Sequence, residues 1–223
     1  MNKIEKIDDT GQVPTIAVIN HGLGNWRSVQ KALEYVGAEA PRTDERQTIL
    51  AADGLVLPGV GAFPEVMRRM AERDLVDPIK RFKKLGKPIL GICLGHQLLF
   101  EASEEQEYTK GLGLLPGVVR RAGGFNVGWS RVTFTRDASL TDGITKKFFY
   151  HLHCCVAVPE DSSVVTVESP FGLPSGEVRT VVGAVQHENL YGVQFHPEKS
   201  GKSPGLELIR NFVQICANDT AGL

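Results

Sequence analysis

The chain has 223 residues, of which 42% are hydrophobic and 23% are charged, which suits one large domain with a continuous core. Its 25 Lys and Arg residues nearly balance its 26 Asp and Glu residues, leaving a net charge of −1. This balance, with no dense basic run, argues against nucleic acid or an acidic membrane surface as the main partner.

The cysteines indicate the compartment. There are four, none in a CxxC pair and two of them adjacent, so neither a disulfide framework nor a zinc ribbon is expected. Free thiols favour a reducing environment. Residues 1–13 carry mixed charges without the apolar core of a signal peptide, and no apolar run reaches the length of a membrane helix. We therefore expect a cytoplasmic protein with no membrane contact.

The first half of the chain alternates short apolar runs with helical patterns. Residues 15–20 predict a buried strand, and Asn25 is placed to cap a helix that ends at Gly37. The pattern continues in chain order with a strand at 54–57, helices at 64–72 and 76–85, a strand at 88–92 and a helix at 94–102. Strands that alternate with helices predict a parallel sheet covered on both faces.

The second half changes to a strand-rich pattern. Turns are expected at Gly123-Gly124, Asp142-Gly143 and Glu188-Asn189. Strands are predicted at 118–121, 129–135, 148–158, 164–167, 181–187 and 190–195, before a helix at 205–216. The predicted fold class is α/β, with a mainly parallel sheet, helices on both faces and an antiparallel extension in the second half. We expect one domain, 14–217, between a flexible N-terminal tail, 1–13, and a C-terminal tail, 218–223.

The strongest local signal is the sequence Gly-Ile-Cys-Leu-Gly at 91–95, between a predicted strand and a predicted helix. Glycines two residues before and after Cys93 remove the Cβ atoms that would collide in a sharp strand-to-helix turn. Such a turn presents the sulfur at the carboxyl end of the sheet, near a helix N-terminus that favours thiolate. A free cysteine is often only a small core residue, but the paired glycines favour a nucleophile at Cys93.

His196 and Glu198 lie in Gln-Phe-His-Pro-Glu, 194–198, at the end of a predicted strand. Proline at 197 keeps His196 extended, and in an extended segment the two side chains face the same side. The carboxylate could then hold the imidazole in the tautomer that takes a proton from Cys93. A surface histidine beside a solvated glutamate is the ordinary alternative, but the strand-end position and the turn far upstream favour catalysis.

Other candidate sites are weaker. His151 and His153 alternate on one strand beside Cys154 and Cys155, but their spacing matches no closed zinc set. The tight turn at 22–24 lacks the third glycine of a dinucleotide fingerprint, because residue 27 is arginine. We expect neither a metal nor another cofactor.

Two motifs give the chain a recognisable pattern, since residues 91–101 and 191–200 resemble the class I, or triad, glutamine amidotransferases. The resemblance covers residues 15–212, nearly the whole chain. Within this family, further segments are similar to the glutaminase subunits of imidazole glycerol phosphate synthases: Gly-Leu-Gly-Asn at 22–25, Pro-Gly-Val-Gly-Ala-Phe at 58–63 and Gly-Trp at 128–129.

The resemblance implies a chemistry that agrees with the motifs. Cys93 would attack the side-chain amide of L-glutamine, and His196 would protonate the departing ammonia. Glu198 would orient the imidazolium and stabilise it. Water would then hydrolyse the thioester and release glutamate.

The resemblance also assigns residues around the reacting atoms. Backbone N–H groups of Val60 and Leu94 would stabilise the oxyanion, and Gly59 and Gly61 would let the loop that carries Val60 move. Gly59 is also expected to contact the substrate. The side chains expected to hold the amino-acid head group of glutamine are those of Gln97 and Glu101, one turn apart on the helix after the nucleophile. His153 and Cys154, which stand in the segment that contacts glutamine in the subfamily, are also expected to bind the substrate.

The resemblance further implies a partner. The (βα)8-barrel cyclase of such a synthase needs about 250 residues, for which this chain leaves no room, so a separate cyclase subunit would receive the ammonia through a shielded channel. Its interface is expected around Asn25 and Trp129. The chain departs from the subfamily pattern at 125–130 and 153–155. Alternatives stay open: a glutaminase subunit for a sugar amidotransferase in surface-polysaccharide synthesis, an inactive regulatory or scaffold subunit, and a stand-alone hydrolase of γ-glutamyl compounds.

Overall fold

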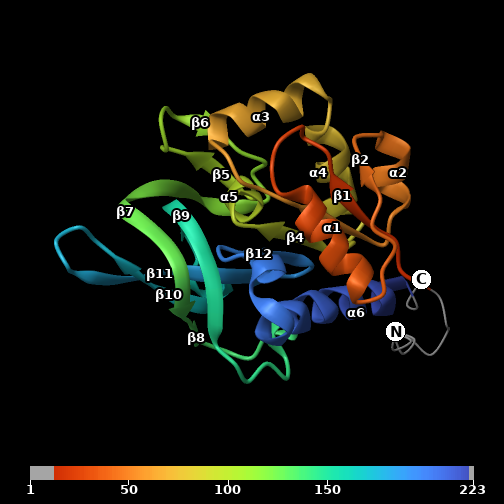
Figure 1. Ribbon diagram of the computed structural model, residues 1–223. Helices are drawn as coiled ribbons and strands as arrows, with labels where there is room; N and C mark the ends of the chain where they lie inside the picture. Colours follow the sequence, from red (N-terminus) through yellow and green to blue (C-terminus); the bar gives the residue numbers. More distant parts are fainter. Residues whose placement is uncertain (1–12, 221–223) are drawn as a thin grey trace.

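Short apolar runs without polar alternation form the central strands, because a strand covered on both faces has no side in contact with water. Every residue is buried in β1 (Ile16–Ile19), β3 (Gly54–Leu57), β4 (Ile89–Ile92) and β12 (Leu190–Val193). A computed structural model describes residues 13–220 of the chain and places these strands side by side in one sheet (Figure 1).

The main sheet has eight strands in the order β2-β1-β3-β4-β12-β11-β10-β8. The strands from β2 (Arg42–Thr43) to β12 run parallel. Antiparallel pairing then adds β11 (Val178–His187), β10 (Val165–Gly172) and β8 (Thr133–Phe134). The prediction of a mainly parallel sheet with an antiparallel extension is therefore confirmed.

Helices cover both faces of this sheet, as predicted. On one face α1 (Trp26–Tyr35) and α6 (Glu207–Thr220) lie together, and their apolar residues share a core with Ile16 and Val18 of β1 (Figure 1). The other face packs against α2 (Arg46–Ala51), α3 (Phe63–Glu72), α4 (Val76–Lys84) and the short α5 (Leu94–Leu98). Successive residues of β1 alternate between the two cores, which is why the strand is apolar throughout.

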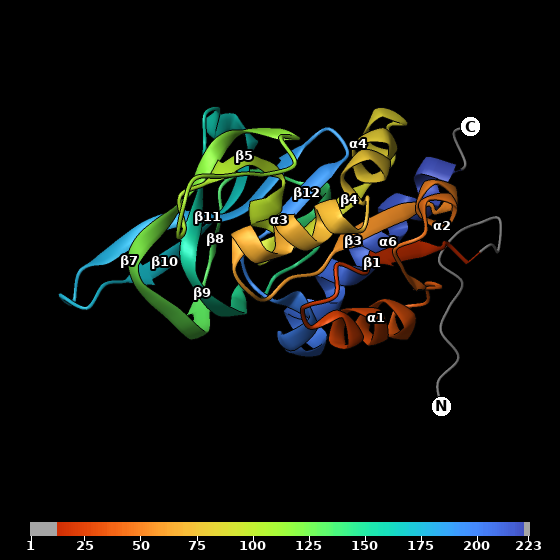
Figure 2. The same ribbon diagram turned by 90° about the horizontal axis from the view of Figure 1, so that it is seen from above.

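A second sheet of four strands lies beside the main one, in the order β6-β5-β7-β9. Its largest part is the antiparallel pair of β7 (Leu115–Arg131) and β9 (Phe148–Pro159), which curve together along one end of the molecule (Figure 2). The smaller strands are β5 (Phe100–Ser103) and β6 (Thr109–Lys110).

Several predicted boundaries are wrong. The helix predicted at 94–102 ends at Leu98, because the chain from Phe100 pairs with β7 as strand β5. No reversal occurs at Gly123-Gly124. Instead, β7 continues through both glycines with an irregular register against β9, joining segments that we predicted as separate strands.

Short elements and chain ends complete the fold. β2 and α2 were not predicted, since neither is long enough to show a clear period. Helix α6 continues to Thr220, past residue 217, where the domain was expected to end. Residues 1–12 of the predicted tail, 1–13, lie outside the described residues, as do residues 221–223 of the predicted C-terminal tail. The remaining turns are η1 (Ser139–Thr141), η2 (Ser162–Val164), η3 (Pro197–Lys199) and η4 (Gly201–Leu206).

Between residues 13 and 220, no helix combines the length and the apolar character that crossing a bilayer would require.

Candidate active site

Cys93 occupies a sharp turn between β4 and α5. Its φ of 53° and ψ of −107° are unusual for a residue other than glycine, and such backbone strain clusters at functional positions. A Cβ atom on Gly91 would lie 2.4 Å from the carbonyl oxygen of Gly95. One on Gly95 would lie 1.8 Å from the carbonyl oxygen of Leu57 on the neighbouring strand. Both positions therefore require glycine, and the predicted turn is confirmed.

His196 follows β12, the strand that pairs in parallel with β4, so both segments leave the same edge of the sheet. Nδ1 of His196 lies 2.8 Å from Oε1 of Glu198, and both side chains are fully buried. The predicted pairing is therefore present. Its predicted geometry is wrong, because Pro197–Lys199 forms a turn of 3-10 helix, which the fixed φ of proline permits, rather than an extended segment.

The main chain fixes His196 against the second sheet. Its N–H donates to the carbonyl oxygen of Tyr150 on β9, at 2.8 Å. The hydroxyl of Ser200 donates to the His196 carbonyl at 2.6 Å and accepts from the Tyr150 N–H at 3.0 Å. The backbone that carries the imidazole is thus joined to both sheets, which limits the motion of the ring relative to Cys93.

Asn25 contacts the carboxylate that holds the imidazole. Its side-chain Nδ2 donates to Oε1 of Glu198, the same oxygen that His196 contacts. Asn25 occupies the N-cap position of α1, where the sequence placed it, but its side chain makes no capping hydrogen bond to the helix. Asn25 is therefore a positioning residue for Glu198, a role that its place in the Gly-Leu-Gly-Asn segment did not indicate.

Electrostatics favour a protonated imidazole in this cluster. Burial by itself lowers the pKa of His196, but interactions with Cys93 and with the Glu198 carboxylate outweigh it and raise the pKa to about 10. Nε2 of His196 has no hydrogen-bond partner within residues 13–220, so it is free to exchange a proton with the sulfur or with a leaving group. A cysteine, an adjacent base and an orienting carboxylate are the parts of an activated nucleophile.

A pocket of about 240 Å³ opens beside Cys93. Besides Cys93, it brings together five of the residues that the sequence assigned to the site: Val60, Leu94, Gln97, His153 and Cys154. His196, Glu198 and Gly59 are not among its lining residues. The other residues that line the pocket are Gly61, Glu105, Phe125, Leu152 and Cys155.

Glu101 does not belong to this pocket. It lies on β5 instead of the predicted helix, its side chain is exposed, and its carboxylate accepts from the Gly117 N–H at 3.2 Å. Among the described residues that line the pocket with Cys93, the carboxylate is that of Glu105, which accepts from the Phe63 N–H at 2.6 Å. Glu101 was expected to bind glutamine because it would stand one helical turn after Gln97. Helix α5 ends at Leu98, before Glu101, so this helical spacing is lost.

Two linked amide side chains lie at the sulfur, and one of them contacts it directly. Gln194 donates to Cys93 Sγ at 3.7 Å and accepts from Gln97 at 3.0 Å. Gln97 also donates to the carbonyl oxygen of Cys155, at 3.1 Å. Gln194 was not predicted as a site residue, although it stands two residues before His196, on the side of the strand that the motif already marked.

The backbone donors proposed for an oxyanion are not both free. The N–H of Leu94 donates to the carbonyl oxygen of Gly59 at 3.4 Å, while Val60 lines the pocket. A Cβ atom on Gly59 would lie 2.6 Å from Cβ of Leu94, so only glycine permits this close approach. An oxyanion could reach the Leu94 donor only after the Gly59 carbonyl has turned away.

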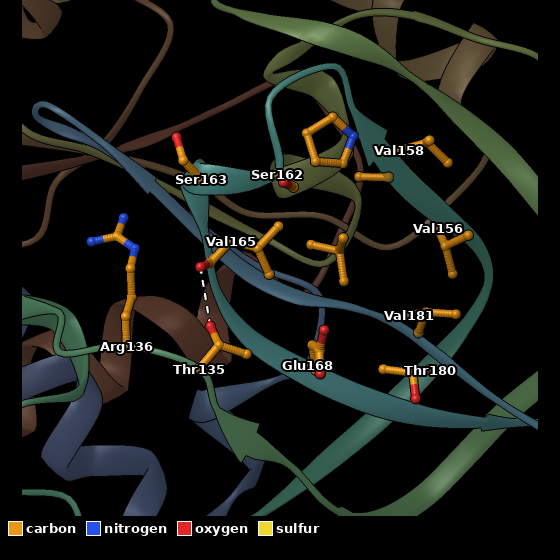
Figure 3. A pocket seen from close by; sticks show the side chains of 13 residues that line it. Thr135, Arg136, Val156, Val158, Ser162, Ser163, Val165, Glu168, Thr180 and Val181 are labelled. Carbon is orange, nitrogen blue, oxygen red and sulfur yellow. Dashed lines mark hydrogen bonds between the residues drawn. The ribbon is translucent and has the colours of Figure 1, made fainter.

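A larger hollow of about 620 Å³ lies elsewhere, against β9, β10 and β11 (Figure 3). Its wall includes Val156, Val158 and Val181, and the hydroxyl of Thr135 donates to the carbonyl oxygen of Val165 at 3.1 Å (Figure 3). The described residues that line it include no cysteine and no histidine. The smaller pocket beside Cys93 is therefore the candidate active site.

The buried histidines around this pocket predict acid lability. Burial, the largest cause, lowers the pKa of His96 and of His151 to about 3 and that of His153 to about 4. Below about pH 6.5 these histidines gain protons in the unfolded chain only, so each should lower the free energy of unfolding by about 1.4 kcal/mol per pH unit down to its folded pKa. His196 has the opposite shift. Its contribution is complete below about pH 6.5 and is lost as the pH rises towards about 10.

Urea unfolding between pH 7 and pH 5 measures this slope. The variant His96→Met should show a slope shallower by about 1.4 kcal/mol per pH unit, because one buried base is gone. Parallel slopes for the two proteins would contradict the assignment of a neutral buried imidazole to His96.

Comparisons with known proteins agree with this geometry. A family model of class-I glutamine amidotransferases matches residues 17–216. The chain is 45% identical over 202 residues to the imidazole glycerol phosphate synthase subunit HisH of Bacillus cereus, covering 88% of this chain and 93% of the relative. It is 44% identical over 205 residues to the HisH subunit of Moorella thermoacetica, covering 90% and 94%.

Solved structures show the same fold at lower identity. The structure of PurLQS from Thermotoga maritima contains a chain that matches with a TM-score of 0.69 at 20% identity, covering 93% of this chain and 99% of that one. Because the family match spans most of the chain and relatives exceed 40% identity, the protein belongs to the class-I glutamine amidotransferases.

Proposed function

We propose that the protein is the glutaminase subunit of an imidazole glycerol phosphate synthase, with Cys93, His196 and Glu198 as its catalytic triad. The observation that carries the proposal is the buried pair of His196 and Glu198, 2.8 Å apart, leaving the sheet beside the strained turn of Cys93. The relatives named HisH supply the choice of synthase.

The reaction begins with the thiolate of Cys93 and the imidazolium of His196. The sulfur attacks the carbon of the glutamine side-chain amide, and the tetrahedral intermediate collapses as Nε2 of His196 gives its proton to the departing ammonia. The neutral imidazole then takes a proton from water, which attacks the thioester and releases glutamate. Glu198 keeps Nδ1 protonated throughout and stabilises the imidazolium.

The pocket explains how glutamine would be oriented. Its α-ammonium group requires a negative partner, and among the described lining residues Glu105 is the carboxylate. We therefore assign head-group recognition to Glu105 in place of Glu101, with the predicted residues His153 and Cys154 and the amide of Gln97 forming neighbouring wall.

The resting backbone supports partner dependence. With the Gly59 carbonyl on the Leu94 N–H, one oxyanion donor is occupied. Losing one such donor costs about 10² to 10³ in turnover, so the isolated subunit should hydrolyse glutamine slowly until a partner shifts the loop that contains Val60.

An apolar stripe supports docking of a separate cyclase subunit next to the pocket. Phe125, Val127 and Trp129 alternate along β7 and so share one face, and their exposed fractions are 72%, 60% and 57%. Phe125 also lines the Cys93 pocket. A partner covering this stripe would exclude water from the pocket mouth, which keeps released ammonia unprotonated.

The test measures glutamate release with and without the cyclase subunit and its ribonucleotide substrate. We expect strong stimulation by the partner in the native protein. The variant Trp129→Glu should need at least about 30-fold more cyclase for half-maximal stimulation, since central aromatic residues contribute about 2 kcal/mol or more to interfaces.

A matched control uses Val178, which is 67% exposed on β11 and lies outside the stripe. Val178→Glu should retain the native response to cyclase. High glutaminase activity without any partner would instead favour a stand-alone hydrolase, and stimulation by a sugar synthase alone would assign the ammonia to that enzyme.

A further inference from the structure

Two thiols and a carboxylate converge on the wall of the Cys93 pocket. The ligand atoms of Glu105, Cys154 and Cys155 all lie within 4.8 Å of one another. Cys155 is buried, while Glu105 and Cys154 are partly exposed to the pocket. The triad chemistry uses neither sulfur, so this cluster needs its own explanation.

The two sulfurs meet because the strand is irregular here. Neighbouring residues of a regular strand point to opposite faces, yet Sγ of Cys154 lies 3.8 Å from Sγ of Cys155. On β7 the register against β9 shifts between Arg121, opposite Cys155, and Asn126, opposite His153. Cys154 therefore has no regularly paired residue opposite it on β7, where residues 122–125 interrupt the register. This irregularity allows the Cys154 side chain to turn towards Cys155.

The spacing fits a soft metal ion. Tetrahedral Zn²⁺ with Zn–S bonds of about 2.3 Å places its sulfur ligands about 3.8 Å apart, the separation found between Cys154 and Cys155. Zn²⁺ also accepts carboxylate oxygen as a ligand, so Glu105 could supply a third bond, and a fourth position would face the pocket. We propose that Glu105, Cys154 and Cys155 bind a thiophilic divalent cation such as Zn²⁺, and that the bound ion excludes glutamine.

The Cys155 thiol carries its proton in the absence of an ion. Burial raises the pKa of the Cys155 thiol, and the nearby Glu105 and Cys154 raise it further, while Arg121 acts in the opposite direction. Binding replaces two S–H bonds by two metal–sulfur bonds, and both protons leave to solvent.

The inference that the bound ion excludes glutamine rests on the proposed function. Glu105 is the carboxylate that we assign to the ammonium group of glutamine, and it cannot hold the ion and the substrate together. Zinc at this position would therefore compete with glutamine, whereas ions bound elsewhere on the surface would not.

The test is a titration with Cd²⁺, a spectroscopic substitute for Zn²⁺, in reduced Cys93→Ser protein, so that the nucleophile contributes no ligand. We expect one ion per chain with the ultraviolet charge-transfer band of thiolate ligands, and displacement by Zn²⁺. Adding Cys154→Ser should weaken binding more than about 100-fold, since loss of even an outer-shell partner costs about 10- to 100-fold. Glu105→Gln should also weaken it, while Cys216→Ala should not.

Two results would overturn the proposal. One is binding that is unchanged by Cys154→Ser and by Glu105→Gln. The other is binding to Cys93→Ser protein that saturating glutamine does not weaken, although glutamine itself binds. Neither readout depends on turnover, so failure here is separate from failure of the glutaminase proposal, which the partner-stimulation assay decides.

Discussion

Replacing Cys93 with alanine is expected to lower cyclase-stimulated glutamate release by a factor of about 10⁴ to 10⁶, the loss seen when the nucleophile of a triad is removed. The thiol is the atom that would form the thioester, and Cys93 is the cysteine whose interaction helps to raise the pKa of His196. The fold should persist, because alanine fits the space of a side chain that is only 4% exposed. Glutamate release is measured with saturating cyclase and its substrate.

The control for this prediction removes a different cysteine. Cys216 on α6 packs beside Gly54, at the opposite end of the sheet from Cys93. Cys216→Ala should keep its turnover within a few-fold of the native protein. A thiol-directed glutamine analogue should add one label to the native chain and to Cys216→Ala, and none to Cys93→Ala. An unlabelled native protein would instead indicate an inactive scaffold.

Replacing Glu198 with glutamine is expected to lower the stimulated kcat/KM by about 10² to 10⁴, since the corresponding change in a serine triad costs about 10⁴. Glutamine keeps the shape of the buried side chain and removes its charge. The His196 imidazolium would lose the counter-charge that lies 2.8 Å from Nδ1. The pKa of His196 should therefore fall below its native value of about 10, which nitrogen NMR of the imidazole measures directly.

Asn25→Ala provides the matched comparison for Glu198→Gln. It removes the hydrogen bond to Oε1 of Glu198 but leaves the carboxylate charged. The loss should be about tenfold, the lower range for a hydrogen bond to a charged group. A Glu198→Gln enzyme with native turnover and an unshifted imidazole would show that the carboxylate has no part in catalysis.

The chemistry of the site could be predicted from short sequence motifs because local steric rules determine it. Gly91 and Gly95 are required by contacts within the turn and with the adjacent strand, so their spacing around Cys93 indicates the turn before any tertiary structure is known. The parallel order of β4 and β12 then brings His196 to the same edge of the sheet. Apolar runs also predicted the layers of the fold, since strands buried on both faces need them.

Only the tertiary structure decided which side chains outside these motifs reach the pocket. Whether Glu101 or Glu105 faces the pocket depends on where α5 ends. The pairing of β5 with β7, and not helical propensity, sets that end. The contact of Asn25 with Glu198 joins residues 173 positions apart.

The approach of Cys154 to Cys155 likewise depends on an irregular register that no local pattern encodes. Local sterics thus indicated the sharp turn at Cys93, and with it the candidate nucleophile, from the sequence alone. Long-range strand pairing determined the rest of its pocket, because the register between strands is set by contacts across the whole core.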